Sequence, residues 1–335
     1  MDTAVLEPVT RGGTGMARCE CESEAVQTLR RRKRVFERYG AFRPAEPSDF
    51  VVKRATSVGE LEAAYRLVHD SFVDSGYIDP HPTGLRVRAF SALPDTALYI
   101  ALAEGRVVGV LSMIPDGPLG LPMDGPFGRE IARLRRMGRR LVEVSDLAIA
   151  KEYRNLRVLT ELTRCAMAHA VTIGADDAVV AVSPSHSGFF EGILQFEPLG
   201  DARPYSAEKN DIVEGKRLSL VCIQEKYRGL DKALGEEAFL YDFYFRSNPY
   251  FTRMPFWFRE GREAAEDPNW FVDFFVKRAA LLARCNEREL AVLASHYPAV
   301  ALWRGLATRA VEPAWQRGQR LTQVLRRAVA VPATG

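Results

Sequence analysis

The order of strand-like and helix-like segments between residues 50 and 224 constrains the fold of this chain more than any other feature. Apolar runs with the length and alternation of β-strands lie at 50–56, 97–117, 141–149, 177–183 and 217–223. Amphipathic helical patterns lie between them, and the first begins with a capping box in which Glu60 follows Ser57 by three residues. Because strands and helices interleave, we predict one mixed α/β domain at 49–224, with strand 141–149 beside strand 178–182 at its centre.

The two flanking regions differ from this domain in composition. Residues 1–48 have low hydrophobicity and contain the basic run Arg30–Arg34, so we expect a poorly ordered basic lead-in whose arginines are either solvated or touch an acidic lipid or partner. Residues 225–335 lack strand signals and read as a helical extension. Ten of the twenty residues from 239 to 258 are aromatic. Such a stretch either packs the extension onto the main domain or makes a peripheral contact with a membrane.

Charge and cysteine content exclude several classes of protein. The net charge is only +3, yet residues 129–164 contain ten Arg or Lys against five Asp or Glu. This local surplus favours one acidic partner over nucleic acid. The five cysteines and five histidines have no disulfide-framework or metal-ligand spacing, so we expect a reduced, cytoplasmic protein without a metal. No apolar run reaches about 18 residues, so we expect no signal peptide and no transmembrane helix.

Three stretches carry a resemblance to a known family. They are ELEAAYRLVHDSF (60–72), LVEVSDLAIAKEYRN (141–155) and SPSHSGFFEGILQFEPLGDARPYS (183–206). In their order and spacing, residues from about 50 to 225 resemble the long-chain N-acyl amino acid synthase branch of the GNAT acyltransferase superfamily, which is related to acyl-homoserine-lactone synthases. The resemblance implies a GNAT-like mixed sheet flanked by helices. It also implies an N-acyltransferase that moves a long-chain fatty acyl group from acyl carrier protein to the amine of an amino acid or similar small amine.

The chain departs from the GNAT pattern at the turn after the central strand. GNAT proteins read Q/R-x-x-G-x-G/A there, and the glycines let backbone N–H groups approach the pyrophosphate of coenzyme A. Here Arg154 takes the first position, while Arg157 and Leu159 take the glycine positions. Either a divergent enzyme still binds coenzyme A, or the donor is acyl carrier protein, whose phosphopantetheine has a single phosphodiester. We expect the carrier protein as donor and no other cofactor.

Arginines that suit a phosphate and an acidic carrier protein gather around this turn in the sequence. For docking of the carrier we expect a ring formed by Arg135, Arg136, Arg139, Arg140 and Arg164. For contact with the donor we expect Arg154, Arg157, Phe190 and the backbone at Ala148 and Ile149. A backbone N–H at Ala148–Ile149 would polarise the thioester carbonyl, as the superfamily implies.

Aminolysis of a thioester requires a base, because the amine of the acceptor is mostly protonated at neutral pH. Glu143 is the first candidate, since an apolar strand would raise its pKa. The alternative is a carboxylate that is salt-bridged to Arg139 or Arg140. Asp146 faces away from Glu143 in a regular strand, but a bulge would bring it back. His186 matches the histidine of the family's P-x-H run and either relays a proton or makes a structural hydrogen bond.

Two departures leave other functions open. The helix after the next strand has Phe189 and Phe190 where many GNAT enzymes have a tyrosine that protonates the leaving thiolate. The extension after residue 225 is not covered by the resemblance. The alternatives are therefore a non-catalytic acyl-binding or regulatory protein of this fold, a coenzyme A-dependent N-acetyltransferase, and a lactone synthase that uses S-adenosylmethionine.

Overall fold

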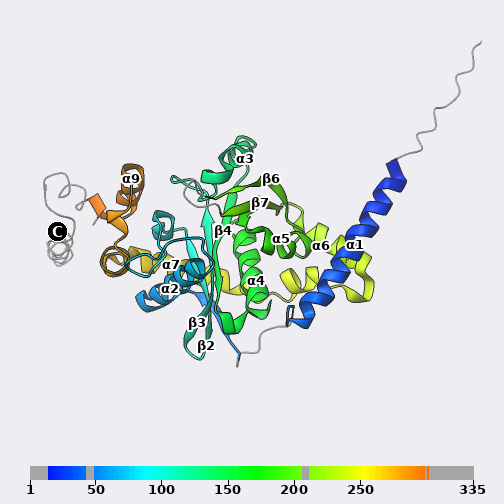
Figure 1. Cartoon of the computed structure of the whole chain (residues 1–335), viewed down its shortest axis with the longest axis horizontal. Helices are drawn as coiled ribbons and strands as arrows, with labels where there is room; N and C mark the ends of the chain where they lie inside the picture. Colours follow the sequence, from blue (N-terminus) through cyan, green and yellow to red (C-terminus); the bar gives the residue numbers. More distant parts are fainter. Residues whose placement is uncertain (1–13, 43–48, 155, 206–210, 299, 302–335) are drawn as a thin grey trace, which may run out of the picture.

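The computed structural model describes residues 14–42, 49–154, 156–205, 211–298 and 300–301. Within these residues a seven-stranded sheet runs in the order β1-β2-β3-β4-β5-β7-β6 (Figure 1). Its strands are β1 (Val51–Arg54), β2 (Ala97–Ala103), β3 (Arg106–Pro115), β4 (Leu141–Ile149), β5 (Asp177–Val182), β6 (Glu197–Pro204) and β7 (Ile212–Ser219). The neighbours β4 and β5 are parallel, and the other neighbouring pairs are antiparallel. This mixed sheet with flanking helices confirms the predicted fold class.

Helices cover both faces of the sheet. One face packs against α2 (Val58–Asp74) and the π-helix Val272–Arg278, and the other packs against α4 (Leu156–Thr172). The predicted capping box is present at the start of α2, where the Ser57 hydroxyl accepts the Glu60 N–H. The other α-helices are α1 (Thr14–Arg38), α3 (Asp124–Arg136), α5 (Pro184–Gly192), α6 (Ile223–Leu234), α7 (Tyr250–Glu266), α8 (Pro268–Phe271) and α9 (Glu287–His296). Short turns of 3-10 or π helix lie at Ala89–Ala92, Lys151–Tyr153, Gly235–Glu237, Asp242–Arg246 and Leu281–Ala283.

Two strands at the edge of the sheet depart from the sequence prediction. The strand β6 is not predicted, because its residues are mostly exposed or half-buried and show no apolar alternation. The strand β7 begins five residues before the predicted run 217–223 and ends at Ser219. Polar Glu214 and Lys216 lie inside β7, where they hide its start, while Leu220 and Ile223 pack in the core as the chain enters α6. Apolar patterns therefore locate β1 to β5 and miss β6 and the start of β7.

Part of the predicted lead-in is a helix that packs on the domain. The 25 residues of α1 carry Leu29, which is buried, and the guanidinium of Arg32 donates to the carbonyl of Gly188 in α5 at 2.8 Å. The phenyl ring of Phe36 lies 5.5 Å from that of Phe189 between ring centroids. The prediction of a poorly ordered lead-in is therefore wrong for residues 26–38, because the basic run is one side of a helix whose other side packs on the domain.

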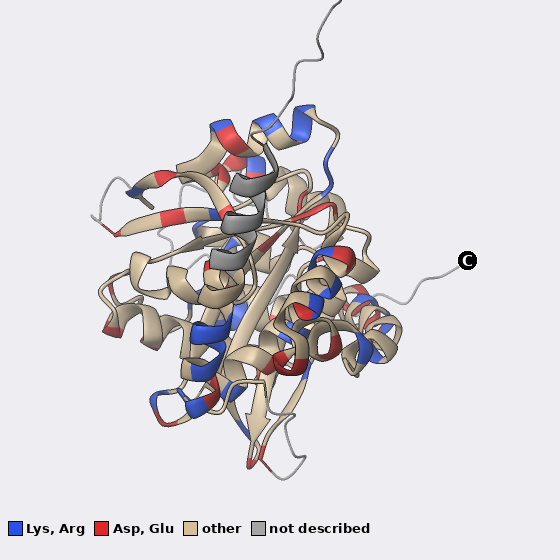
Figure 2. Ribbon diagram, turned by 90° about the vertical axis from the view of Figure 1, so that its right-hand side faces the viewer, with Lys and Arg blue, Asp and Glu red and all other residues tan. Residues whose placement is uncertain are grey.

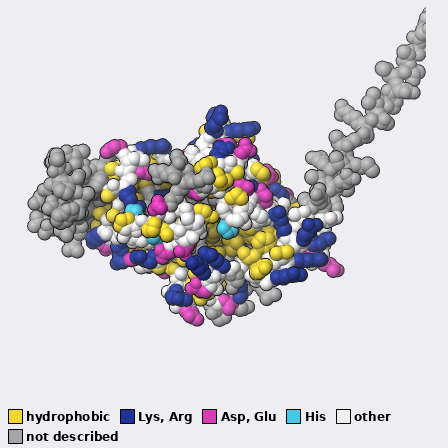
Figure 3. Space-filling model, viewed as in Figure 1, with side chains coloured by type: hydrophobic (Ala, Val, Ile, Leu, Met, Phe, Trp, Pro, Cys, Tyr) yellow, Lys and Arg dark blue, Asp and Glu magenta, His cyan; other side chains and the backbone are white. Residues whose placement is uncertain are grey.

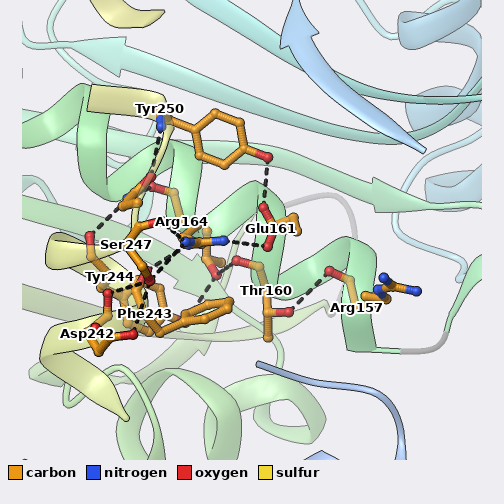
Figure 4. A network of polar contacts seen from close by, with 11 residues as sticks. Arg157, Thr160, Glu161, Arg164, Asp242, Phe243, Tyr244, Ser247 and Tyr250 are labelled. Carbon is orange, nitrogen blue, oxygen red and sulfur yellow. Dashed lines mark hydrogen bonds and ion pairs between the residues drawn. The ribbon is translucent and has the colours of Figure 1, made fainter. Parts of the chain in front are cut away.

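The aromatic stretch 239–258 forms a seam between the extension and α4. Six of its ten aromatic residues are buried, and Phe256 is the exposed one, at 57%. Figure 4 shows the polar part of this seam, in which Arg164 of α4 donates to the carbonyls of Phe243 and Ser247. Among the described residues no helix is both long and apolar enough to cross a membrane. A further helix expected at 313–329 lies outside the described residues.

Candidate active site

A β-bulge in the middle of β4 decides which side chains meet. Leu141 packs in the cluster around α3, whereas Val142 and Val144 pack in the cluster around α4, so successive residues alternate between the two faces. The pairing of β4 with β3 shifts register between Ser145 and Ala148, and Asp146 has a φ of +50°. The extra residue ends the alternation and returns Asp146 to the face that carries Glu143 and Ser145. The structure therefore contains the bulge that the sequence analysis named as a condition for bringing Asp146 to the face of Glu143.

Asp146 is buried and clamped by positive charge. Its carboxylate accepts hydrogen bonds from Arg88 Nη2 at 3.1 Å and from the Ser112 hydroxyl at 3.0 Å. Arg86 Nε lies 3.6 Å from the same carboxylate. Burial alone would raise the pKa of Asp146, but Arg88, Arg86 and the Ser112 hydroxyl together hold it below its usual value. Asp146 is therefore a fixed negative charge at neutral pH.

Glu143 behaves in the opposite way. Its side chain is 2% exposed, and its carboxyl accepts one backbone hydrogen bond from Met123 N–H at 2.8 Å. Burial raises the pKa of Glu143 to about 8, and the charge of Arg88 only partly opposes this shift. The predicted alternative of a salt bridge to Arg139 or Arg140 is wrong, because these arginines pair with the Asp177 and Asp176 carboxylates. Glu143 therefore exchanges a proton near neutral pH.

Sequence reasoning missed four residues of this site, namely Arg86, Arg88, Ser112 and Tyr205. Arg88 links it together, since its guanidinium also donates to the Ser145 hydroxyl at 3.0 Å and to the Tyr205 hydroxyl at 3.3 Å. The signal for Arg86 and Arg88 is present in LRVRA, where two arginines alternate with buried apolar residues in an extended segment. Tyr205 ends the ARPY run that contributes to the resemblance. We call Arg86, Arg88, Ser112, Glu143, Asp146 and Tyr205 the bulge cluster.

The arginines of the bulge cluster are incompletely satisfied. The Nε atoms of both Arg86 and Arg88 are buried without a hydrogen-bond acceptor among the described residues. Asp146 is the described carboxylate that is ion-paired with them, and Asp211 acts on Arg86 at longer range. Two buried guanidinium groups therefore share Asp146 as their ion-pair partner. A buried guanidinium donor without an acceptor favours binding of an additional anionic group.

The strands β4 and β5 separate beyond the bulge cluster. Their pairing begins at Leu141 and Asp177 and ends at Glu143 and Val179. Beyond that point β4 continues to Ile149 and β5 to Val182 without pairing to each other. We call these unpaired ends the fork. Ala150 N–H donates to the Val108 carbonyl of β3, so by strand alternation the Ile149 N–H points toward the fork, whereas the neighbouring N–H of Ala148 points toward β3. A free N–H directed into an opening between strands suits a developing oxyanion.

The predicted donor-binding residues Arg154 and Phe190 lie in different surroundings. Arg154 lies at the fork with the predicted catalytic residue His186, and Arg154 Nε donates to the Ile149 carbonyl at 3.3 Å while its charge acts on His186. His186 is exposed, and its Nδ1 lies 2.8 Å from the Ser183 hydroxyl. Partial desolvation and then Arg154 lower the pKa of His186, so it is neutral at pH 7. Among the described residues no hydrogen bond joins it to the bulge cluster. Phe190 is 3% exposed and is a core residue.

The predicted docking ring is not a ring. Arg164 is buried at 3% and bound to Glu161, so its assignment to a docking surface is wrong. Arg135 pairs with both Asp116 and Asp124. Arg136 and Arg140 are exposed, but they lie with Arg139 between the end of α3 and the start of β4, which is the end of β4 opposite the fork. The prediction grouped these arginines because they are close in sequence. In the structure the length of β4 separates them from Arg154 and Arg157.

The described residues contain no group of three or more His, Cys, Asp or Glu side chains placed to hold a metal ion. We take the bulge cluster and the fork together as the candidate site. It combines a carboxyl that titrates near pH 8, a fixed carboxylate, two arginines with free donors and an N–H directed into the fork.

Comparison with known proteins finds a matching family model. Residues 63–213 match the family model of the N-acyl amino acid synthase FeeM. This confirms the resemblance seen in the sequence and supports an N-acyltransferase activity. The matched region contains β2 to β6, the bulge and the fork, and it excludes α1 and the C-terminal extension. No curated protein matches the sequence.

Solved structures of low sequence identity are similar to about half of this chain. FeeM, an N-acyl amino acid synthase from uncultured soil microbes, is 23% identical over 52% of this chain and 93% of its own, with a TM-score of 0.47. An acyl-CoA N-acyltransferase from Pseudomonas aeruginosa is 16% identical over 51% of this chain and 99% of its own, with a TM-score of 0.36. The CoA-dependent acyl-homoserine lactone synthase BjaI is 19% identical over 57% and 91%, with a TM-score of 0.41.

Proposed function

We propose that this chain is an N-acyltransferase that moves a long-chain fatty acyl group from acyl carrier protein to the α-amine of an amino acid. The match of residues 63–213 to the N-acyl amino acid synthase family model supports the reaction class. The choice of acceptor and donor comes from the geometry of the bulge cluster and of the start of α4.

The observation that carries the proposal is the pair of buried arginine Nε atoms in the bulge cluster that lack a hydrogen-bond acceptor among the described residues. An amino acid brings a carboxylate as well as an amine, whereas a simple amine brings only the latter. The free Nε donors of Arg86 and Arg88 suit that carboxylate, because guanidinium groups bind carboxylates through paired N–H donors. The fixed charge of Asp146 and the carboxyl of Glu143 lie on the same face of β4 and suit the ammonium group.

Glu143 is the proposed base. In its ionised form it takes a proton from the ammonium group, and the neutral amine then attacks the thioester carbonyl. The amide C–N bond forms and the C–S bond breaks. The second proton of the attacking amine goes to the leaving thiolate, which departs as the thiol of the phosphopantetheine arm. A pKa of about 8 brings Glu143 much closer to an α-amine than an ordinary glutamate, which favours proton transfer between them. The Ile149 N–H is the proposed donor to the oxyanion.

The start of α4 favours a carrier protein over coenzyme A. In the coenzyme A grip, N–H groups at this helix start face the pyrophosphate. Here the Leu156 N–H donates instead to the carbonyl of Tyr39 at 2.9 Å, and Arg157 pairs with Asp49 at 2.7 Å. The chain itself thus takes up groups that a pyrophosphate would need. A phosphopantetheine arm needs only a single phosphodiester contact, for which Arg154 at the fork is available.

An acyl chain also requires an apolar surface next to the fork. Partly buried apolar side chains of Leu147, Ile149, Tyr153 and Leu159 pack along the edge of the main core. Figure 3 shows hydrophobic side chains gathered on this face of the molecule, over α4 and α5. We propose that the fatty acyl chain lies along this surface.

The test of the proposed function is direct analysis of products. Lipid extracts from cells that express the wild-type chain should contain new N-acyl amino acids, which name the acceptor, and extracts with the Glu143→Gln variant should lack them. Purified protein should then use acyl carrier protein thioesters at least tenfold better, in kcat/KM, than the coenzyme A thioester of the same acyl group. Equal use of both donors would contradict the carrier protein, and products that persist in Glu143→Gln would contradict the base.

A further inference from the structure

One exposed face of α1 carries arginines that are not ion-paired to any described residue. Most arginines of the predicted docking ring, in contrast, are paired with carboxylates. Arg31, Arg34, Val35 and Arg38 recur at helical spacing, and all four are exposed. Among the described residues neither Arg31 nor Arg38 is ion-paired, while Arg34 shares Glu237 with Arg30. A shallow hollow of about 390 Å³ along this face is lined by Gln27, Arg30, Arg31, Arg34, Val35 and Arg38. We call Arg31, Arg34, Val35, Arg38 and the adjoining Tyr39 the α1 face.

The opposite side of α1 is fixed to the domain, so the α1 face has a defined position. Arg32 reaches across α5 so closely that a Cβ at Gly192 would lie 1.8 Å from its guanidinium. A side chain at residue 192 would therefore displace Arg32 from this contact. Lys33 donates to the carbonyl of Glu237 at 2.8 Å, and Leu29 is buried. These contacts leave the α1 face as the solvent side of the helix.

The α1 face lies at the rim of the fork. The end of α1 adjoins the start of α4, where Tyr39 accepts the Leu156 N–H, and its middle adjoins α5 through Arg32 and Gly188. The helices α4 and α5 are the segments that follow the two strands of the fork. Figure 2 shows α1 turned toward the viewer with its run of Lys and Arg residues, and Figure 3 shows Lys and Arg beside the hydrophobic surface over α4 and α5.

We propose that the α1 face is the docking surface for the acidic carrier protein that delivers the acyl group. This inference rests on the proposed function and goes beyond it, because α1 lies outside the matched residues 63–213. The surface has the composition of a small transient protein interface, with arginines and an exposed tyrosine around a single aliphatic side chain. Docked there, a carrier protein has its phosphopantetheine arm next to Arg154 and the fork.

Two features favour an acidic protein over an anionic membrane. The α1 face offers only Val35 and Tyr39 as exposed apolar side chains, at 47% and 62% exposure. An interfacial helix needs a continuous apolar side to enter the lipid, and the apolar side of α1 is already buried on the domain. A rim of arginines steers an acidic protein and accelerates its association, most strongly at low salt.

The test compares charge-reversal variants with two donors. Arg31→Glu with Arg38→Glu removes the two unpaired arginines of the α1 face. Arg253→Glu with Arg262→Glu is the matched control, because both arginines are exposed on α7 and carry no ion pair among the described residues. Arg133→Glu with Arg136→Glu tests the α3 location that the sequence suggested. Each variant is assayed with acyl carrier protein and with the acyl-pantetheine thioester, which has no carrier, and circular dichroism checks folding.

We expect the α1 variant to raise KM for acyl carrier protein about tenfold at 50 mM salt and less at 500 mM salt. Its kcat and its activity with acyl-pantetheine should stay at the wild-type level, as should all parameters of the α7 control. An unchanged KM in the α1 variant overturns the proposal, as does a larger effect in the α3 variant. Loss of anionic-vesicle sedimentation in the α1 variant with an unchanged KM overturns it in favour of a membrane.

Failure of the proposed function gives a different result. In that case neither the wild-type protein nor any of the variants transfers an acyl group from the carrier protein. Titration of wild-type and α1-variant protein with fluorescently labelled holo carrier protein then decides the docking surface alone. Binding that is tenfold weaker in the α1 variant supports the α1 face, and equal binding or none overturns it.

Discussion

Two buried groups of arginine and carboxylate lie on different elements of this molecule, and they differ in how completely they are satisfied. On α4, Arg164 donates from all three of its nitrogens, to Phe243, Glu161 and Ser247, and Glu161 also accepts from the Tyr250 hydroxyl (Figure 4). In the bulge cluster both Nε donors lack acceptors and Glu143 has a pKa of about 8. The saturated group joins the extension to the domain, whereas the unsaturated group has capacity left for a ligand.

The largest expected effect is on activity, which should depend on the bulge cluster and not on the Arg164 group. Glu143→Gln should lower kcat about 10²–10³-fold with little change in thermal stability, because it removes a base and keeps the shape of the side chain. Single-turnover kinetics with saturating acyl donor measures this. Glu161→Gln, the matched change in the saturated group, should retain kcat. If Glu161→Gln lost as much activity as Glu143→Gln with its fold intact, the distinction between the groups would fail.

The second effect is on stability, which should depend more on the Arg164 group than on the bulge cluster. Arg164→Met should lower the free energy of unfolding by about 3 kcal/mol or more, because it leaves the buried Glu161 carboxylate unpaired. Urea denaturation followed by tryptophan fluorescence measures this change. Arg88→Met should lower the free energy of unfolding by less, because Asp146 keeps Arg86 as a positive partner after the substitution. Equal losses of stability in the two variants would contradict the comparison.

The third effect concerns recognition of the acceptor. Arg86→Met should raise KM for an amino acid about tenfold and leave KM for the carrier protein unchanged, since it removes one guanidinium donor from the proposed carboxylate contact. Steady-state kinetics with the acceptor varied at saturating donor gives both constants. A rise in the KM of the carrier protein alone would place Arg86 in the donor site instead.

The smallest effect is a dependence on pH. The base acts in its ionised form, so kcat/KM for the acceptor should rise with pH and level off above about 8, and Glu143→Gln should lose this limb. The stability of the wild type should change in the opposite sense. An unfolded Glu143 releases its proton near 4.5 and the folded one near 8, so unfolding becomes easier as pH rises between these values. Thermal melts from pH 4.5 to 8.5 should show a smaller decline for Glu143→Gln.

The sequence predicted those parts of the fold that follow from local pattern. The apolar run 141–149 is β4 over its full length, and Ser57 and Glu60 form the capping box at α2. The strand β6 escaped prediction because edge strands are exposed and lack an apolar pattern. The helix α1 escaped because its apolar residues are sparse, and their burial depends on contacts with α5 and α6 that lie more than 150 residues away.

The site was predicted in part for the same reason. Glu143 follows from its type in an apolar strand, and Asp146 joins it only through a bulge that residue types did not specify. Arg88 comes from a loop 58 residues before Asp146, so sequence distance hid it. Arg164 was misplaced because its periodic position on α4 does not reveal that the extension covers it.

The central claim is that the free arginine donors of the bulge cluster bind the carboxylate of an amino acid acceptor. The most direct measurement is kcat/KM of the wild-type protein for matched pairs of acceptors, phenylalanine beside phenethylamine and leucine beside isopentylamine, with Arg88→Gln assayed in parallel. We predict that for at least one pair the wild type prefers the amino acid at least 100-fold, and that Arg88→Gln abolishes most of this preference. Equal rates for amino acid and amine in the wild type would contradict the account.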